Sequence, residues 1–183
     1  SITDKNGKFI ASNKTLTILQ SERAKIAKEA SNKLNQAADI LRRYYKPREQ
    51  WLVYCQSRDH IQEIVEKLKE IDLDSSIYHS KMNKDEKIKT LNEFKDNGGI
   101  LLSIRCLDEG VDIPSISHAL IISSDQNPRQ FIQRRGRVLR IDKNNPNKDR
   151  AYIYDLIISC GNSNYDSIKS LTASELKRSY EFA

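Results

Sequence analysis

Short apolar segments alternate with longer amphipathic segments along most of the chain, and this alternation limits the possible folds more than any other feature. Residues 51–55, 99–104 and 119–123 are nearly continuous apolar runs of strand length, a pattern typical of strands buried on both faces. Stretches with apolar residues three to four positions apart lie between such runs, as in amphipathic helices. The sequence therefore predicts an α/β domain with a mostly parallel central sheet covered by helices on both faces.

The other elements continue this alternation. A long helix is expected over 13–45, and Pro47 and its neighbours end it. The expected strands are 51–55, 76–79, 99–104, 119–123 and 152–158, and the later helices are 57–71, 85–95, one that starts at Pro128, and 166–182.

The composition is that of a globular domain with a basic surface. The net charge is +6 and the pI about 9.2, which favours a polyanionic partner without requiring one. No segment approaches the roughly 18–20 apolar residues of a membrane span, and no signal peptide is recognised. Cys55, Cys106 and Cys160 lie far apart without metal-binding spacing. We therefore expect no metal site, no disulfide framework and a cytoplasmic location, with Cys55 as a small buried hydrophobe.

The segment 133–140 concentrates positive charge. It reads Gln-Arg-Arg-Gly-Arg-Val-Leu-Arg, and in a helix Gln133, Arg137 and Arg140 share one face at i, i+4 and i+7. A bound anion would relieve the mutual repulsion of these cations, and the planar guanidinium group suits phosphate oxygens. Three kinds of anion remain open: a nucleotide, a nucleic-acid backbone, or solvent counterions around an ordinary polar helix face.

Two further loops carry polar residues directly after expected strands, where ligands gather in a parallel sheet. Ser57 and Arg58 follow the strand 51–55 at the start of a helix, where backbone amides already attract anions. Ser80 follows the strand 76–79. Both loops can contact a phosphate, but Ser57 also fits an ordinary N-cap, and Ser80 also fits a solvated turn.

The loop 103–114 contains the compact run Glu-Gly-Val-Asp-Ile-Pro. Gly110 permits tight backbone geometry and Pro114 fixes the exit from the loop. Asp112 can accept hydrogen bonds from a ribose, or it can cap backbone amides within a turn.

Three of these segments together resemble a known family. Residues 51–57, 103–114 and 127–140 resemble motifs IV, V and VI of the C-terminal RecA-like lobe of superfamily 2 helicases and translocases. The resemblance covers about residues 50–158 and implies a three-layer, RecA-like fold of the P-loop NTPase type. It places this domain at 47–183, after an N-terminal helical connection at 1–46.

The resemblance also assigns roles to residues. Arg137 and Arg140 match arginine fingers that face the γ-phosphate of ATP, and Gln133 matches the residue that contacts this phosphate or its attacking water. Gly110 and Asp112 match positions near the ribose and the lobe interface. The positions that match loops gripping the nucleic-acid backbone are Ser57, Arg58, Ser80, Ser103 and Arg105. Many relatives carry threonine where Ile104 stands, which leaves the backbone contact there to Ser103.

The start of motif VI distinguishes branches of this family. Gln133 and the Arg-Val-Leu-Arg ending resemble DNA-directed branches, such as excision-repair helicases and the translocating subunits of restriction enzymes. The DEAD-box RNA branch usually begins this motif with histidine. The resemblance therefore favours DNA as partner and leaves RNA open.

The 183 residues contain no Gly-x-x-x-x-Gly-Lys-Ser/Thr phosphate loop and no Asp-Glu-x-His/Asp box. The resemblance implies that ATP and Mg²⁺ are held mainly by an N-terminal lobe of the parent chain, and that this domain alone does not hydrolyse ATP. Two other functions stay open: a stand-alone nucleic-acid-binding module, and a small-molecule-binding domain of flavodoxin-like type. A pure binding module needs positive charge but does not need Gln133, Arg137 and Arg140 on one face.

Overall fold

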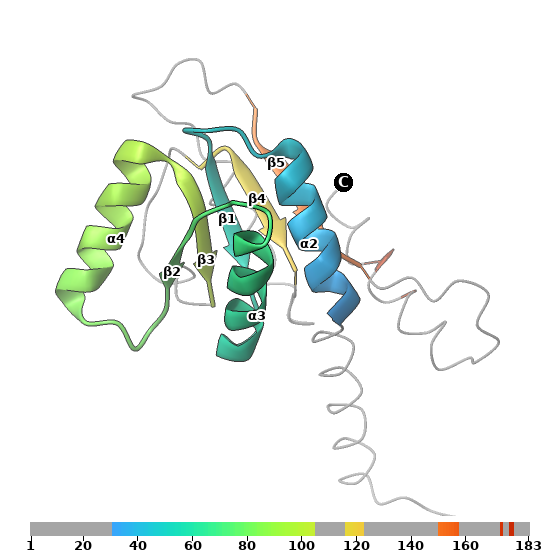
Figure 1. The fold of residues 1–183 in the computed structure, drawn as a ribbon, viewed down its shortest axis with the longest axis horizontal. Coiled ribbons are helices and arrows are strands. Elements are labelled where there is room, and N and C mark those ends of the chain that lie inside the picture. The colour runs from blue at the N-terminus through green and yellow to red at the C-terminus, as the bar shows by residue number, and fades with distance from the viewer. Residues whose placement is uncertain (1–30, 105–115, 123–149, 158–172, 174–175, 178–183) are drawn as a thin grey trace, which may run out of the picture.

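The computed structural model describes residues 31–104, 116–122, 150–157, 173, 176 and 177. Within these segments a five-stranded sheet has the order β2-β3-β1-β4-β5, and every pair of neighbouring strands is parallel (Figure 1). The helices are α2 (Ser31–Tyr44), α3 (Arg58–Lys69) and α4 (Lys84–Asn97), and the strands are β1 (Gln50–Tyr54), β2 (Ser75–Tyr78), β3 (Gly99–Ser103), β4 (His118–Ile121) and β5 (Tyr152–Asp155).

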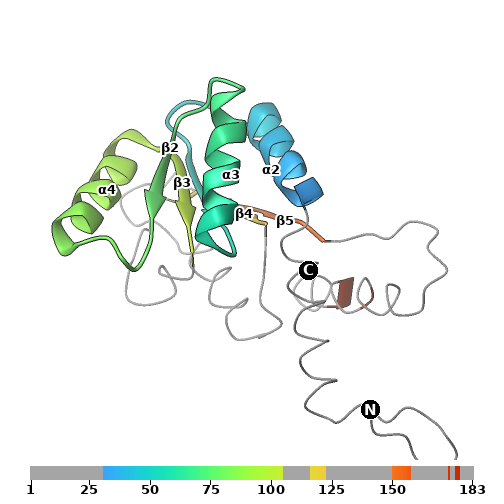
Figure 2. The same ribbon diagram turned by 60° about the horizontal axis from the view of Figure 1, so that its bottom comes forward.

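The central strand β1 separates two apolar layers. Trp51 and Val53 point to one face of the sheet and pack with buried residues of α2 and α3. Leu52 and Tyr54 point to the other face and pack with Phe94 of α4. Figure 2 shows α2 and α3 together on one face. The predicted three-layer α/β architecture is therefore confirmed.

The helix α2 belongs to this core. Leu34, Ala37 and Leu41 are fully buried and recur at the three-to-four spacing of an amphipathic helix. The part of the expected helix that precedes Ser31 lies outside the described residues, and the domain boundary at residue 46 stays a prediction.

Side-chain caps fix the start of α4. The side chain of Asn83 accepts a hydrogen bond from the Glu86 amide at 2.8 Å, and the Glu86 carboxylate accepts one from the Asn83 amide at 3.0 Å. These two bonds form a capping box. The helix accordingly begins at Lys84 rather than at residue 85, and it continues to Asn97, beyond the predicted end at residue 95.

Gly98 ends α4 where the chain passes close to the turn before β1. Its φ is +74°, and a Cβ atom at this position would lie 2.5 Å from the carbonyl oxygen of Arg48. We expect Gly98→Ala to lower the free energy of unfolding by more than about 2 kcal/mol, since backbone strain and overlap add. Gly99→Ala is the matched control, because its φ of +115° is also unfavourable but nothing lies within 4 Å. Equal losses in urea denaturation of the two variants would contradict the overlap.

Cys55 continues β1 into the core and is 2% exposed, as predicted. Burial raises the pKa of its thiol to about 12, so the thiol stays protonated and unreactive in the folded protein.

The described helices include none that is long and apolar enough to cross a membrane.

His118 is a buried ionisable residue at the start of β4. Its ring stacks on Trp51 with centroids 4.4 Å apart, and its Nδ1 lies 2.8 Å from Ser117 Oγ and 4.0 Å from a Glu49 carboxylate oxygen. Burial lowers the pKa of His118, which outweighs the opposing effect of Glu49, and the charge of Lys46 lowers it further. His118 is therefore neutral at pH 7.

This lowered pKa predicts a pH dependence of stability. The unfolded chain takes up a proton at His118 near its ordinary pKa of 6.5, whereas the folded chain does so only at lower pH. The free energy of unfolding should therefore fall as the pH drops below about 6.5 and level off below the folded-state pKa. The variant His118→Phe keeps a stacked ring, and we expect a weaker pH dependence in that window by urea denaturation. An identical slope would contradict this origin.

Candidate functional site at the carboxyl edge of the sheet

The carboxyl ends of the strands meet at one edge because the sheet is parallel. Ser103 at the end of β3 is in register with Tyr54 of β1 and with Tyr78 of β2. The loops that follow these three strands therefore start side by side, as predicted. Of the predicted nucleic-acid contacts, Ser57, Arg58, Ser80 and Ser103 lie in this part of the structure.

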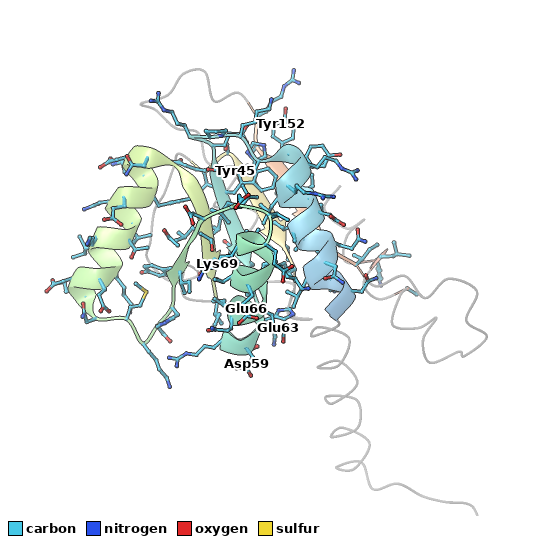
Figure 3. All side chains as sticks on the ribbon, in the orientation of Figure 1. Tyr45, Asp59, Glu63, Glu66, Lys69 and Tyr152 are labelled. Atoms are coloured by element: carbon cyan, nitrogen blue, oxygen red, sulfur yellow. The ribbon has the colours of Figure 1, made fainter. Side chains whose placement is uncertain are left out.

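Ser57 is the N-cap of α3. Its hydroxyl oxygen accepts a hydrogen bond from the His60 amide at 3.2 Å, so the N-cap interpretation is confirmed. The hydroxyl can still donate its own proton to a phosphate oxygen. The next residues, Arg58 and Asp59, are both exposed, and Figure 3 labels Asp59 at this end of α3. The negative charge of Asp59 beside Arg58 limits how strongly this helix end attracts a phosphate.

The loop after β2 gathers cations around Ser80. Ser80 and Lys81 are exposed, and Lys87 reaches back from α4 to donate a hydrogen bond from Nζ to the Ser80 carbonyl at 2.9 Å. The Ser80 hydroxyl and the ammonium groups of Lys81 and Lys87 thus come from one short segment, an arrangement suited to a phosphate backbone. Lys87 was not among the predicted site residues. The available signal was its position four residues after the N-cap Asn83, which directs it toward the turn.

Ser103 is fully buried between its neighbouring strands. Its carbonyl oxygen accepts a hydrogen bond from the Cys55 amide at 2.8 Å, and its hydroxyl has no hydrogen-bond partner among the residues that the structure describes. Its proposed contact with a nucleic-acid backbone stays a prediction.

The remaining predicted site residues lie outside the described segments. They comprise the expected nucleotide contacts of this lobe and one expected nucleic-acid contact, Arg105, so these roles stay predictions. They are Arg105, Gly110, Asp112, Gln133, Arg137 and Arg140.

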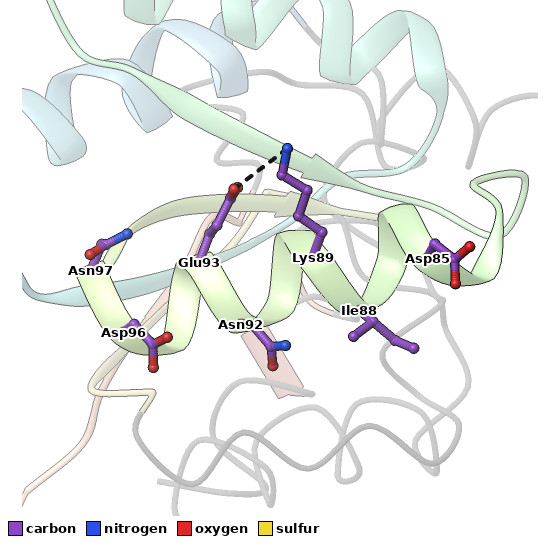
Figure 4. A pocket seen from close by; sticks show the side chains of 7 residues that line it. All are labelled: Asp85, Ile88, Lys89, Asn92, Glu93, Asp96 and Asn97. Carbon is purple, nitrogen blue, oxygen red and sulfur yellow. Dashed lines mark ion pairs between the residues drawn. The ribbon is translucent and has the colours of Figure 1, made fainter.

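A groove lies along α4, with a lining that extends from Asp85 in the first turn of the helix to Asn97 at its end (Figure 4). It includes Ile88, which is 47% exposed, and the ion pair of Lys89 with Glu93 at 3.9 Å. Both members of this pair are largely solvent-exposed, so the pair contributes little to stability. We assign no ligand to this groove.

A parallel sheet with helices on both faces defines an open α/β domain, and the polar loops after β1 and β2 lie at its carboxyl edge, where ligands gather in such sheets. The family model "Helicase conserved C-terminal domain" matches residues 32–142. The chain therefore belongs to this family, and its structure is that of a superfamily 2 helicase C-terminal lobe.

Curated relatives cover both RNA and DNA enzymes. MJ1505 of Methanocaldococcus jannaschii, named as a candidate ATP-dependent RNA helicase, is 28% identical over 59% of this chain and 15% of its own length. The DNA 3'-5' translocase XPB2 of Sulfurisphaera tokodaii is 33% identical over 46% of this chain and 18% of its own length. The chain thus spans less than a fifth of these relatives.

Solved structures show the same fold. The C-terminal domain of the DEAD-box protein Dbp5 matches with a TM-score of 0.61 over 85% of this chain and 82% of that domain, at 16% identity. The E. coli DEAD-box protein SrmB matches with a TM-score of 0.55 over 68% of this chain and 69% of that chain, at 16% identity.

Proposed function

We propose that the chain is the second motor lobe of an ATP-dependent DNA helicase or translocase. One observation carries the proposal: the family match over 32–142 includes all three motif segments, 51–57, 103–114 and 127–140. In this proposal ATP and Mg²⁺ are held mainly by the N-terminal RecA-like lobe of the parent chain. The lobe described here supplies charge to that site and contacts to the nucleic acid.

In this proposal, particular residues of this lobe carry particular chemical tasks. Arg137 and Arg140 stabilise the negative charge that develops as the γ-phosphoryl group is transferred, and Gln133 orients the attacking water. Gly110 and Asp112 contact the nucleotide from this side of the cleft. Bound ATP supplies the phosphoryl group and favours closure of the two lobes.

The carboxyl-edge loops hold the nucleic acid. Ser80 and Lys81 donate hydrogen bonds to backbone phosphates, and Lys87 adds positive charge next to Ser80. Such contacts carry no sequence information, which suits a protein that moves along its substrate. Lobe closure and opening then let this lobe grip and release the strand in turn.

The choice of DNA rests on Gln133 and on the likeness to the translocase XPB2. RNA is the second candidate, because other relatives are named RNA helicases, including DEAD-box helicase 22 of rice at 26% identity. The two-lobe protein is this chain joined to the N-terminal lobe of its parent chain. Measuring its ATP hydrolysis in the presence of DNA and, separately, of RNA of equal length distinguishes these candidates. Stimulation by RNA alone would replace the DNA proposal, and no stimulation by either would favour a stand-alone binding module.

The proposed grip predicts the effect of removing one cation. In the two-lobe protein, Lys87→Ala should raise the DNA concentration for half-maximal ATPase stimulation and leave the maximal rate unchanged. It should also make the dependence of DNA affinity on salt less steep: the negative slope of the logarithm of the binding constant against the logarithm of the salt concentration should shrink in magnitude by about 1. Lys89→Ala is the matched control, because Lys89 lies on the same helix but pairs with Glu93 instead. Equal effects of the two variants would contradict a grip at the Ser80 loop.

A further inference from the structure

Three rings form a row across the amino edge of the sheet, opposite to the carboxyl-edge loops. Trp51, His118 and Tyr152 are in register on the neighbouring strands β1, β4 and β5. Trp51 stacks on His118 at 4.4 Å and 3°, and His118 stacks on Tyr152 at 5.0 Å and 14°. Figure 3 places Tyr152 at the end of the molecule far from Asp59. These three residues are called the ring row below.

Core packing explains the inner part of this row but not its end. Trp51 is fully buried and His118 is 8% exposed, whereas Tyr152 is 48% exposed. Tyr152 lies on β5, the last strand in the described sheet order. Three large hydrophobic residues in the described segments are exposed, and two of them, Tyr152 and Tyr44, belong to this aromatic region. Tyr44 joins it through Tyr154, which stacks on Trp51. The row therefore ends in a ring that is open to solvent.

Exposed cations surround this end of the sheet. Lys46 and Arg48 lie in the short connection between α2 and β1, and Arg43 lies in the last turn of α2. The same connection contains one carboxylate, that of Glu49. It already accepts hydrogen bonds from Trp51 Nε1 at 2.9 Å and from the Lys46 amide at 3.1 Å. This anchors the connection to the ring row, so the cations stay near it. The cations Arg43, Lys46 and Arg48, together with the exposed Arg150 just before β5, are called the basic rim.

We propose that this amino edge is a second contact for single-stranded nucleic acid. Tyr152 stacks on one unpaired base, which continues the ring row by one step, and the basic rim contacts the phosphates beside that base. Stacking on an aromatic ring accepts any base, and backbone phosphates match the cations. An acidic peptide could pair with the cations of the basic rim, but it has no base to stack on the exposed ring of Tyr152. A single-stranded nucleic acid uses both features. The contact needs neither ATP nor the N-terminal lobe, so it stands apart from the proposed motor function.

The test uses the chain and fluorescein-labelled oligo-dT and oligo-U of about 12 nucleotides, with binding measured by fluorescence anisotropy. We expect Tyr152→Ala to weaken binding about tenfold, and Tyr152→Phe, which keeps the ring, to bind within about twofold of the unmodified chain. The double variant Lys46→Glu, Arg48→Glu should weaken binding and reduce its salt dependence. Lys69→Glu, an exposed cation on α3 (Figure 3), is the charge control. The dT and U arms show whether the site prefers DNA or RNA.

A second readout does not depend on the variants being folded. Photo-crosslinking of the unmodified chain to an oligonucleotide with 5-iodouracil, followed by peptide mapping, should place a crosslink at Tyr152. Crosslinks confined to the carboxyl-edge loops, or full binding by a folded Tyr152→Ala, would overturn the proposal. Binding of polyglutamate with no binding of either oligonucleotide would also overturn it. The binding measurement contains neither ATP nor the N-terminal lobe, so its outcome is separate from that of the motor proposal.

Discussion

Replacing Arg137 with alanine in the two-lobe protein is expected to lower kcat for nucleic-acid-stimulated ATP hydrolysis by about 10³-fold or more. An arginine finger acts mainly on the charge that develops in the transition state. The loss should therefore appear in kcat, with a much smaller change in the KM for ATP. Steady-state ATPase measurements at saturating nucleic acid give both values.

Arg134→Ala is the matched control for this prediction. Arg134 belongs to the same basic segment, but in a helix it falls outside the face shared by Gln133, Arg137 and Arg140. We expect it to change kcat far less than Arg137→Ala does. Equal losses would mean that the segment acts through total charge, and unchanged turnover in Arg137→Ala would reject the finger assignment.

Replacing Trp51 with alanine is expected to cost about 3–5 kcal/mol of unfolding free energy, the largest stability effect among the described residues that we consider. Its side chain is fully buried, stacks on the rings of His118 and Tyr154, and donates a hydrogen bond to Glu49 at 2.9 Å. Alanine would leave a cavity and deprive the Glu49 carboxylate of this donor. Urea denaturation followed by circular dichroism measures the change.

Tyr44→Ala provides the comparison. Tyr44 also belongs to this aromatic region, since its ring lies tilted by 30° against that of Tyr154 with centroids 5.6 Å apart, but it is 46% exposed. We expect a loss of about 1 kcal/mol or less, as for surface positions. If Trp51→Ala lost no more than Tyr44→Ala, the ring row would not be part of the core.

The fold class could be predicted because its signal is local. Continuous apolar runs marked β1 and β3, and the apolar stripe that includes Ile61, Ile64 and Leu68 marked α3. Element ends were less accurate where side chains set them. The α4 helix is longer than predicted because the Asn83–Glu86 capping box starts it and Gly98 stops it. The strand β4 starts at His118, one residue earlier than predicted, where the ring stacks between Trp51 and Tyr152.

For the candidate site, the sequence could predict which loops meet at one edge of the sheet, but not how their side chains pack. A parallel sheet brings the loops after β1, β2 and β3 to one edge, so the proximity of Ser57, Ser80 and Ser103 followed from the fold class. The burial of Ser103 and the reach of Lys87 to the Ser80 carbonyl depend on tertiary packing. The ring row was missed for the same reason, because its members lie far apart in the sequence and meet only through strand register.

The shared active site is tested most directly by measuring ATP hydrolysis for three proteins under identical conditions with saturating DNA. They are this chain alone, the upstream lobe alone, and the two joined as in the parent protein. If ATP is held by one lobe and its transition state is stabilised by the other, only the joined protein should turn over at a substantial rate. Hydrolysis by this chain alone at the rate of the joined protein would contradict the proposal that it supplies half of an active site.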